Sequence, residues 1–303
     1  MSRWLELSVR VPAEFVEPVA EMLRRYGKGA VAVVEDGYDP ENDPQPPSRY
    51  RDATCIGYLP MDRTLWSARE HIRVGLALVS HLCPLPEPAE REVEENEWEQ
   101  VWKSHFNLMR VGRRIVVKPS WQSYIPGPED AVVELDPGMA FGTGYHPTTR
   151  MCLEALERLS LPGMEVLDVG SGSGILSIAA AKLGASRVVG VDIDPVAIRV
   201  ARVNVRANGV SSQVRLYRGT LPYPRVPAGA FHLVLANITA RTLTAMAGAL
   251  ASALRPEGTL VASGMLEKQA AQVEEAFLGA GMLTRERLFE GDWVAIVTGG
   301  PPR

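Results

Sequence analysis

The sequence has few of the residues that build disulfides or metal sites. Its three cysteines, Cys55, Cys83 and Cys152, lie far apart among 303 residues, and no Cys-x-x-Cys pair occurs. An odd number of widely spaced cysteines supports neither a disulfide framework nor a zinc site. We therefore expect free thiols, no bound metal and a reducing compartment, the cytoplasm.

Long hydrophobic runs are also missing. The N-terminal segment has no apolar core of the kind found in signal peptides, because Glu6 and Arg10 interrupt it. The most apolar helical stretches, Gly174–Ala185 and Leu243–Leu254, are too short to span a bilayer. The sequence therefore predicts a soluble protein without a membrane partner.

An excess of positive charge is the third absence. The chain has 32 lysines and arginines against 36 aspartates and glutamates, a formal net charge of −4. Proteins that bind nucleic acid through many phosphates normally carry a basic face. The composition therefore argues against a general polyanion binder, although it leaves room for a local basic patch. Seven glutamates between Glu87 and Glu99 indicate either a solvated connector or a docking surface for a basic partner.

The apolar residues, 46% of the total, are enough to build the two domains that the length suggests. Alternation of apolar and polar residues predicts the first strand, and helical spacing and turn signals predict five further elements. We expect strands at Arg3–Val11, Ala30–Glu35, Cys55–Leu59 and Arg91–Glu97, and helices at Phe15–Leu23 and Leu65–Leu82. The order β-α-β-β-α-β is that of a ferredoxin-like α+β domain.

From Met164 onward, strands and helices alternate regularly. Such alternation predicts an α/β fold with a doubly wound, mostly parallel, Rossmann-like sheet that binds its ligand at the carboxyl ends of the strands. We expect strands at Glu165–Val169, Arg187–Val191, Gln213–Tyr217, His232–Ala236, Thr259–Ser263, Thr284–Leu288 and Trp293–Val297, with helices such as Ile175–Leu183, Pro195–Asn208 and Lys268–Ala280.

Three prolines, Pro84, Pro86 and Pro88, mark the exit from the first domain. We therefore assign residues 1–88 to the ferredoxin-like domain, 89–120 to a connector that contains a helix, and 121–303 to the larger α/β domain. Residues Asp36–Asp52 are rich in Pro, Asp, Asn and Gly and read as a long exposed loop.

The strand Glu165–Val169 runs into the glycines Gly170, Gly172 and Gly174, which permit a tight turn and close approach of a ligand to the backbone. The spacing is Gly-x-Gly-x-Gly, with Ile175 where a dinucleotide fingerprint would have its third glycine. An isolated match of this kind is also compatible with a turn that binds nothing.

An acidic residue, Asp192, ends the next strand twenty-two residues after Gly170. A carboxylate at this place can accept hydrogen bonds from the hydroxyls of a ribose. Asp194 precedes Pro195, which favours a role as a helix N-cap. Gly170 and Asp192 together predict an adenosine-containing ligand, either a dinucleotide or S-adenosylmethionine.

A polar residue, Asn237, ends the fourth strand at the edge where the ligand is expected. Class I methyltransferases place a short polar motif here, beside the methyl group. Enzymes that methylate nucleobases or glutamine amides usually carry Asn/Asp-Pro-Pro-aromatic, whereas this chain continues with Ile238, Thr239 and Ala240. The motif therefore argues against base methylation. Simple capping of the strand end is the alternative role for Asn237.

The most specific segment is the glycine- and threonine-rich loop from Asp136 to Thr149, which can fold over a small ligand. Together with the glycine turn, Asp192 and Asn237, it resembles the ribosomal protein L11 methyltransferase family. The resemblance extends from about Trp98 to Val297 and includes that family's domain connector.

The resemblance implies a class I methyltransferase that transfers methyl groups from S-adenosylmethionine to the N-terminal amine and lysine side chains of ribosomal protein L11. It also implies that the N-terminal domain grips the substrate protein, with no nucleic acid required; monomer is our default. Carried over by position, the residues contacting the cofactor are Thr149, Gly170, Asp192 and Asn237, with Phe141 and Gly172 as neighbours. Thr239 and Tyr145 depart from the family's usual Leu and Thr, which bears on the acceptor pocket.

Such a reaction needs no nucleophile from the enzyme, because the substrate amine attacks the methyl group directly and catalysis is mostly alignment. We therefore assign no catalytic residue and interpret His105 and His146 as structural. Presenting a lysine of pKa about 10.4 as a neutral amine at about pH 7.5 costs about 4 kcal/mol. An α-amine of pKa about 7.8 costs less than about 1 kcal/mol, so it is the easier acceptor.

Three alternatives remain open on the sequence. An RNA methyltransferase would use the N-terminal domain as an RNA platform, against which the acidic run and the missing Pro-Pro-aromatic motif argue. A nicotinamide dehydrogenase would need the Gly-x-Gly-x-x-Gly spacing that the chain lacks. A ribosome-assembly factor that only keeps the cofactor pocket would bind S-adenosylmethionine without turnover.

Overall fold

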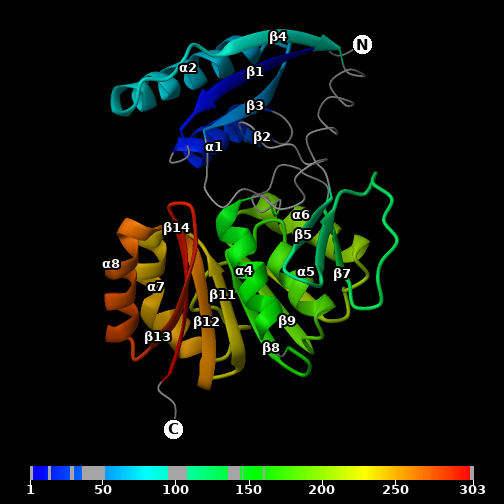
Figure 1. Ribbon diagram of the computed structural model, residues 1–303, viewed down its shortest axis with the longest axis vertical. Helices are drawn as coiled ribbons and strands as arrows, with labels where there is room; N and C mark the ends of the chain where they lie inside the picture. Colours follow the sequence, from blue (N-terminus) through cyan, green and yellow to red (C-terminus); the bar gives the residue numbers. More distant parts are fainter. Residues whose placement is uncertain are drawn as a thin grey trace. The chain divides into compact units, whose positions relative to one another are not determined.

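The computed structural model describes residues 3–12, 15–27, 31–35, 52–94, 108–135, 144, 146–159 and 161–300. The chain divides into two compact units. The described residues up to Glu94 belong to the first unit, and those from Leu108 onward belong to the second. Figure 1 labels the elements of each unit. The predicted loop Asp36–Asp52, apart from its last residue, and the aromatic part of the predicted connector lie outside the described residues.

The first unit is a four-stranded sheet with two helices on one face. Its strand order is β2-β3-β1-β4, and every neighbouring pair is antiparallel. This arrangement is that of the ferredoxin-like fold predicted from the sequence. In chain order the elements are β1 (Arg3–Val11), α1 (Val16–Tyr26), β2 (Ala32–Glu35), β3 (Ala53–Pro60), α2 (Leu65–Leu82) and β4 (Ala89–Glu94).

The core of this unit lies between the sheet and the two helices. Every second side chain of β1 points inward, as the alternating sequence predicts. The helices bury their apolar stripes against the same face, which keeps water from all of these side chains. The inward set includes Leu5, Leu7, Val9 and Val11 of β1 with Val19, Leu23, Ile72 and Leu76 of the helices.

Strand β4 has the sequence Ala-Glu-Arg-Glu-Val-Glu, and so many acidic residues disfavour a strand. Arginines on other elements offset that acidity: Arg3 of β1 pairs with Glu92 at 3.2 Å, and Arg69 of α2 pairs with Glu90 at 2.6 Å. The strand begins two residues earlier than predicted, so residues Ala89–Glu94, which we assigned to the connector, belong to the sheet.

The second unit is built on a seven-stranded sheet of order β10-β9-β8-β11-β12-β14-β13. Numbered from β8, this is the order 3-2-1-4-5-7-6, in which β14 alone runs antiparallel to its neighbours. The doubly wound sheet predicted from the sequence is confirmed. The strands are β8 (Glu165–Val169), β9 (Arg187–Asp192), β10 (Val214–Arg218), β11 (Phe231–Asn237), β12 (Leu254–Leu266), β13 (Leu283–Glu290) and β14 (Trp293–Gly299).

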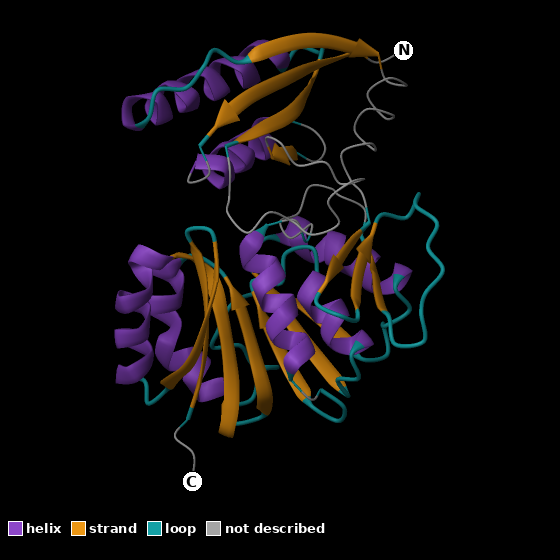
Figure 2. Cartoon of the chain, in the orientation of Figure 1, coloured by secondary structure: helices purple, strands orange, loops and turns teal. Residues whose placement is uncertain are grey.

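Helices cover both faces of this sheet (Figure 2). Neighbouring residues of a strand face opposite cores: Val166 of β8 packs with the first group of helices, and Leu167 packs with the second. The first group is α4 (Pro147–Arg158), α5 (Ile175–Lys182) and α6 (Pro195–Ala207), and the second is α7 (Ala240–Ala253) and α8 (Glu267–Gly279).

A small third sheet, of order β5-β6-β7, also belongs to the second unit. Its strands are β5 (Met109–Val111), β6 (Ile115–Lys118) and β7 (Ala131–Glu134). The three-residue strand β5 has too few residues to show a period and was not predicted. The carboxylate of Glu157 in α4 accepts hydrogen bonds from the backbone N–H groups of Arg113, at 2.8 Å, and Arg114. Residues from 108 onward thus fold with the larger unit instead of forming part of a connector.

Candidate functional site

The glycine turn after β8 has a backbone that only glycine adopts easily. Gly170, Gly172 and Gly174 have φ values of +75°, +51° and +84°. The N–H of Gly170 donates to the carbonyl oxygen of Val191 at 2.8 Å, which fixes the turn against the end of β9. A Cβ atom on Gly170 would lie 2.4 Å from Cγ2 of Ile238. The turn therefore packs between the ends of β9 and β11.

Asp192 lies directly against this turn. Its Oδ2 accepts a hydrogen bond from the N–H of Gly172 at 2.9 Å, and its Oδ1 accepts one from the N–H of Asp194 at 2.9 Å. Each carboxylate oxygen keeps a further lone pair for hydroxyl donors. Asp194 caps α6 through the N–H of Val196 at 2.8 Å, as predicted.

Ile193, between these two aspartates, was not assigned a role from the sequence. Its side chain is 70% exposed although it follows a buried strand. An exposed apolar side chain beside a carboxylate suits a ligand that has both a flat ring and hydroxyl groups. The signal in the sequence was a large apolar residue placed after the strand had ended.

Asn237 joins β11 to the first turn of α4. Its Nδ2 donates to Oγ1 of the fully buried Thr149 at 3.1 Å. Its Oδ1 is buried and has no hydrogen-bond partner among the residues that the structure describes. A buried acceptor of this kind normally has a partner. Within the described part of the chain, the amide therefore offers a buried acceptor at the carboxyl edge of the sheet.

Five of the predicted site residues therefore meet at one edge of the sheet. Strand β8 lies between β9 and β11, so the residues that follow these strands are neighbours. The five residues are Thr149, Gly170, Gly172, Asp192 and Asn237. The sixth, Phe141, lies outside the described residues, as does His105.

His146 acts as the N-cap of α4. Its Nδ1 accepts a hydrogen bond from the N–H of Thr148 at 3.3 Å and lies 2.6 Å from Oγ1 of the same residue. The imidazole ring meets the ring of Trp293 edge-on, with 4.6 Å between their centroids. These contacts give His146 a structural role at the start of α4.

Asp168 is a buried acid under the glycine turn. Its Oδ2 accepts a hydrogen bond from the hydroxyl of Ser177 at 2.6 Å. Burial raises the pKa of Asp168 to about 6, opposed by the Ser177 hydrogen bond and reinforced by the charge of Asp192. Its Oδ1 lacks a partner within the described ranges, so the turn has a second unsatisfied acceptor beneath it.

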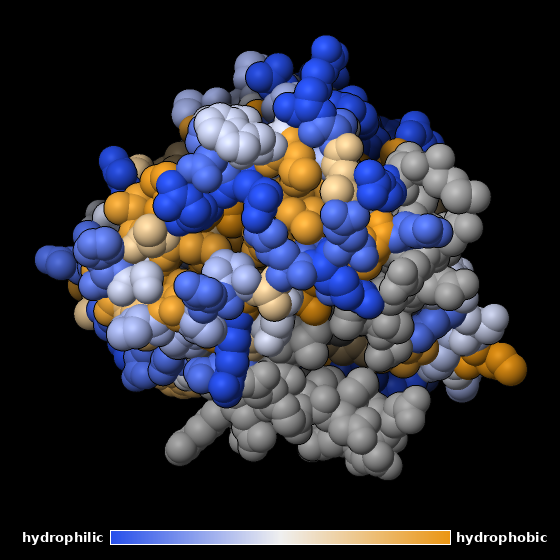
Figure 3. All heavy atoms as spheres, turned by 90° about the horizontal axis from the view of Figure 1, so that it is seen from above, coloured by the Kyte–Doolittle hydropathy of each residue, from blue (hydrophilic) through white to orange (hydrophobic). Residues whose placement is uncertain are grey.

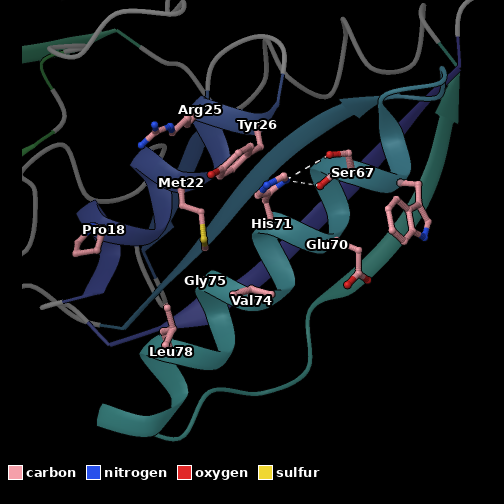
Figure 4. A pocket seen from close by; sticks show the side chains of 11 residues that line it. Pro18, Met22, Arg25, Tyr26, Ser67, Glu70, His71, Val74, Gly75 and Leu78 are labelled. Carbon is pink, nitrogen blue, oxygen red and sulfur yellow. Dashed lines mark hydrogen bonds between the residues drawn. The ribbon is translucent and has the colours of Figure 1, made fainter.

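A groove of about 580 Å³ lies between the two helices of the first unit (Figure 4). Gly75 allows the helices to approach closely, because a Cβ atom there would lie 2.1 Å from Sδ of Met22. The rings of Tyr26 and His71 stack with 4.8 Å between centroids. The exposed guanidinium of Arg25 lies 6.0 Å from the centre of the Tyr26 ring.

Apolar side chains border this groove along one ridge of α2. Trp66, Val74, Leu78 and Leu82 follow one another at multiples of four residues and are 52 to 78% exposed. Hydrophobic residues reach the surface between hydrophilic ones in the space-filling view (Figure 3). Glu70 occupies the position between Trp66 and Val74, so the row is interrupted by one charge. Exposed apolar side chains gathered beside a groove indicate an interaction surface.

Neither a membrane span nor a metal cluster is found within the described residues. No helix there combines the length and hydropathy needed to cross a bilayer. No group of three or more His, Cys, Asp or Glu side chains converges there either. None of the three cysteines is in a disulfide; Cys55 and Cys152 are buried and Cys83 is half-buried.

Comparison with known proteins gives consistent matches. A family model described as "Ribosomal protein L11 methyltransferase (PrmA)" matches residues 3–299. A protein of that name from Chloroflexus aurantiacus is 43% identical over 319 residues, 97% of each chain. Another from Geobacter sulfurreducens is 49% identical over 215 residues, 71% of this chain and 70% of its own. A crystal structure of ribosomal protein L11 methylase from Lactobacillus delbrueckii subsp. bulgaricus matches with a TM-score of 0.61 at 30% identity, covering 65% of this chain and 100% of that one.

Proposed function

The chain belongs to the ribosomal protein L11 methyltransferase family, and on that premise we propose that it methylates the N-terminal α-amine and lysine ε-amines of ribosomal protein L11. It is an S-adenosylmethionine-dependent enzyme with the class I fold. The observation that carries the proposal is the Oδ1 of Asn237, which has no hydrogen-bond partner among the described residues and lies at the edge where the glycine turn and Asp192 also lie. The matches do not favour the alternative of an RNA methyltransferase.

The residues at this edge fit the cofactor in chemistry. Asp192 offers free lone pairs to the ribose hydroxyls, and Ile193 offers an apolar surface to the adenine ring. Gly170 and Gly172 let a ligand approach the backbone closely. Thr149 and Asn237 would hold the cofactor at the end that carries its methyl group, and the resemblance to the family also assigns Phe141 to the cofactor's surroundings.

Alignment of the acceptor amine is the task of Asn237. S-adenosylmethionine, when bound, would supply an electrophilic methyl carbon on a sulfonium; the neutral amine of the substrate would bond to this carbon, and the sulfur would leave with the electron pair of its bond to the methyl group. The Oδ1 of Asn237 accepts a hydrogen bond from an amine N–H and so directs the nitrogen lone pair toward that carbon. The amine must be neutral to attack, which makes the α-amine the faster acceptor at neutral pH.

The groove between α1 and α2 is the surface on which L11 docks. Trp66, 76% exposed, is the type of residue that anchors protein interfaces. The apolar ridge of α2 fits an apolar face of the partner, and Arg25 fits a carboxylate at its rim. This assignment makes the first unit, which includes β4, the substrate-recognition domain.

We further propose that the enzyme works in the cytoplasm as a monomer and needs no nucleic acid. Free L11 is then a sufficient substrate, and the acidic segment from Glu87 to Glu99 favours a basic protein partner over RNA. Size-exclusion chromatography with light scattering tests the monomer, and nuclease treatment of the reaction tests the independence from RNA.

The decisive experiment is to incubate the purified protein with S-adenosylmethionine and recombinant L11 and to measure the intact mass of L11. We expect mass gains in multiples of one methyl group, and none with an Asp192→Ala variant. Cofactor binding without any gain on L11 would refute the substrate and reopen the RNA methyltransferase and the non-catalytic factor. Absence of cofactor binding would refute the whole proposal.

A further inference from the structure

A buried ion pair joins α4 to the end of β13 next to the proposed site. The guanidinium of Arg150 contacts Oε1 of Glu290 through Nε at 2.8 Å and through a second, shorter contact from its terminal nitrogen. The two side chains are only 7% and 17% exposed. Arg150 follows Thr149 directly in the first turns of α4, and Glu290 is the last residue of its strand.

The hairpin that follows Glu290 holds α4 at a second point. Trp293, at the start of β14, meets the N-cap residue His146 with 4.6 Å between ring centroids. The carbonyl oxygen of Asp292, in the turn, accepts a hydrogen bond from the N–H of Glu267 at 2.8 Å, so the turn is itself anchored to α8. Helix α4 runs beside the hairpin in Figure 1. Thr149 is thus held between two contacts to the same hairpin.

We infer that Arg150 and Glu290 are positioning residues that fix Thr149, and through it the Asn237 amide, for methyl transfer. The hydroxyl of Thr149 accepts from Nδ2 of Asn237, which turns Oδ1 of the amide toward the site. A shift of the first turn of α4 would move that hydroxyl and release the amide. Neither Arg150 nor Glu290 touches the reacting atoms, and this inference rests on the proposed function.

Stability alone does not account for the pair. Replacement of a buried ion pair by packed apolar side chains is often neutral or stabilising, because desolvation of two charges offsets their attraction. An apolar pair, however, would not fix the geometry of the contact. The hydrogen bonds between the planar guanidinium and a carboxylate fix both the distance and the relative orientation of the two side chains.

A second ion pair between the same two elements provides a matched control. Arg158 at the other end of α4 contacts Glu286 of β13 at 2.6 Å, with both side chains about half exposed. It resembles the buried pair in chemistry and in the elements it joins, but it lies two turns away from Thr149. Its removal tests the effect of loosening α4 from β13 without disturbing the first turn.

The experiment compares the full-length double variant Arg150→Met/Glu290→Leu with the control Arg158→Met/Glu286→Leu. In the first we expect kcat on L11 to fall about 10- to 100-fold, the scale of a misplaced aligning group. The KM for L11 and the melting temperature should stay close to those of the parent, and the affinity for S-adenosylmethionine should fall by a much smaller factor than kcat. Hydrogen exchange should rise in peptides that cover residues 146–152. The control should match the parent in every measurement.

The inference is overturned if the Arg150/Glu290 double variant keeps the kcat of the control. It is also overturned if kcat falls only in parallel with cofactor affinity and melting temperature, since that is the pattern of a purely structural pair. If the double variant does not fold, Glu290→Asp replaces it, because this change shortens the side chain and keeps the charge; parental kcat in that variant overturns the inference. A parent without activity on L11 would instead refute the proposed function.

Discussion

Asn237 and Thr149 are joined by a single hydrogen bond, with 3.1 Å between Nδ2 and Oγ1, across elements that are 88 residues apart in the chain. The bond uses the donor end of the amide and leaves the acceptor end unsatisfied among the described residues. The orientation of the amide on β11 therefore depends on the Thr149 hydroxyl of helix α4. The same hydroxyl sets the direction in which the amide can hold an amine.

Replacement of Thr149 by valine should disorient the Asn237 amide. Valine keeps the shape of the side chain but removes the acceptor, so Nδ2 is left buried without its bond. We expect kcat on L11 to fall about tenfold, with a loss of stability of about 1 kcal/mol. Steady-state kinetics and denaturant unfolding measure the two effects. Thr149→Ser keeps the hydroxyl and should behave as the parent; equal activity of the valine variant would show that the bond has no role.

Asp192 should carry much of the cofactor affinity. In Asp192→Asn one oxygen acceptor becomes a donor, so a hydrogen bond from the ribose is lost and a donor faces a hydroxyl. We expect the affinity for S-adenosylmethionine to fall about 30-fold, or about 2 kcal/mol, by isothermal titration calorimetry. Asp194→Asn is the control, because asparagine caps a helix as well as aspartate does. Similar losses in both variants would assign the effect to the local backbone instead of the ribose.

Asp168 should make the stability of the protein depend on pH between about 4 and 6. Burial raises its pKa to about 6, so the folded state holds a proton that the unfolded state has already released. Stability is therefore lost as pH rises through this window, by an amount on the order of 3 kcal/mol. Asp168→Asn stays neutral, and its advantage in melting temperature over the parent should grow from pH 4 to pH 7. A constant difference would contradict the assignment.

Asp130 supplies a control of opposite sign for that measurement. A hydrogen bond from Arg110, with others from Tyr124 and the N–H of Gly127, holds the pKa of Asp130 well below its usual range. Its ionised form is the one that the fold stabilises. Asp130→Asn should therefore lower the melting temperature at neutral pH, and that deficit should shrink as the pH is lowered.

The ridge on α2 should determine the KM for L11 without affecting the cofactor. Trp66→Ala and Leu78→Glu remove or charge exposed side chains that the fold of the unit does not need. We expect KM for L11 to rise about tenfold, the scale of a modest interface hot spot, with unchanged affinity for S-adenosylmethionine. Ile125→Glu, at a position that is 93% exposed in the second unit, is the control. An unchanged KM in the α2 variants would remove the groove as the docking surface.

Local patterns predicted the elements well where one period dominates. The bounds of β1, α2 and β8 match the prediction, because alternation or helical spacing extends through each of them. The charged strand β4 begins earlier than predicted, because its acids pair with arginines of β1 and α2 that are distant in the sequence. The antiparallel direction of β14 depends on packing within the sheet, which local sequence does not encode.

The same distinction applies to the site. Residues that follow strands, such as Gly170 and Asp192, could be predicted because the carboxyl ends of parallel strands share one edge. Two contacts of the site could not be predicted from sequence spacing. The hydrogen bond from Asn237 to Thr149 joins residues 88 positions apart, and the ion pair of Arg150 with Glu290 joins residues 140 positions apart. Ile193 was visible in the sequence, but only its exposure distinguishes it from a core residue.

The insertion of β14 between β12 and β13 also has a consequence during translation. Every predicted cofactor residue leaves the ribosome before Glu290 and Trp293 do, yet the first turn of α4 rests on both. A nascent chain that ends before the hairpin contains every predicted cofactor residue. It lacks Glu290 and Trp293, whose contacts hold the first turn of α4. From the role inferred for the hairpin, we expect full methylating activity only from chains whose synthesis has passed it, although shorter chains already carry the glycine turn and Asp192.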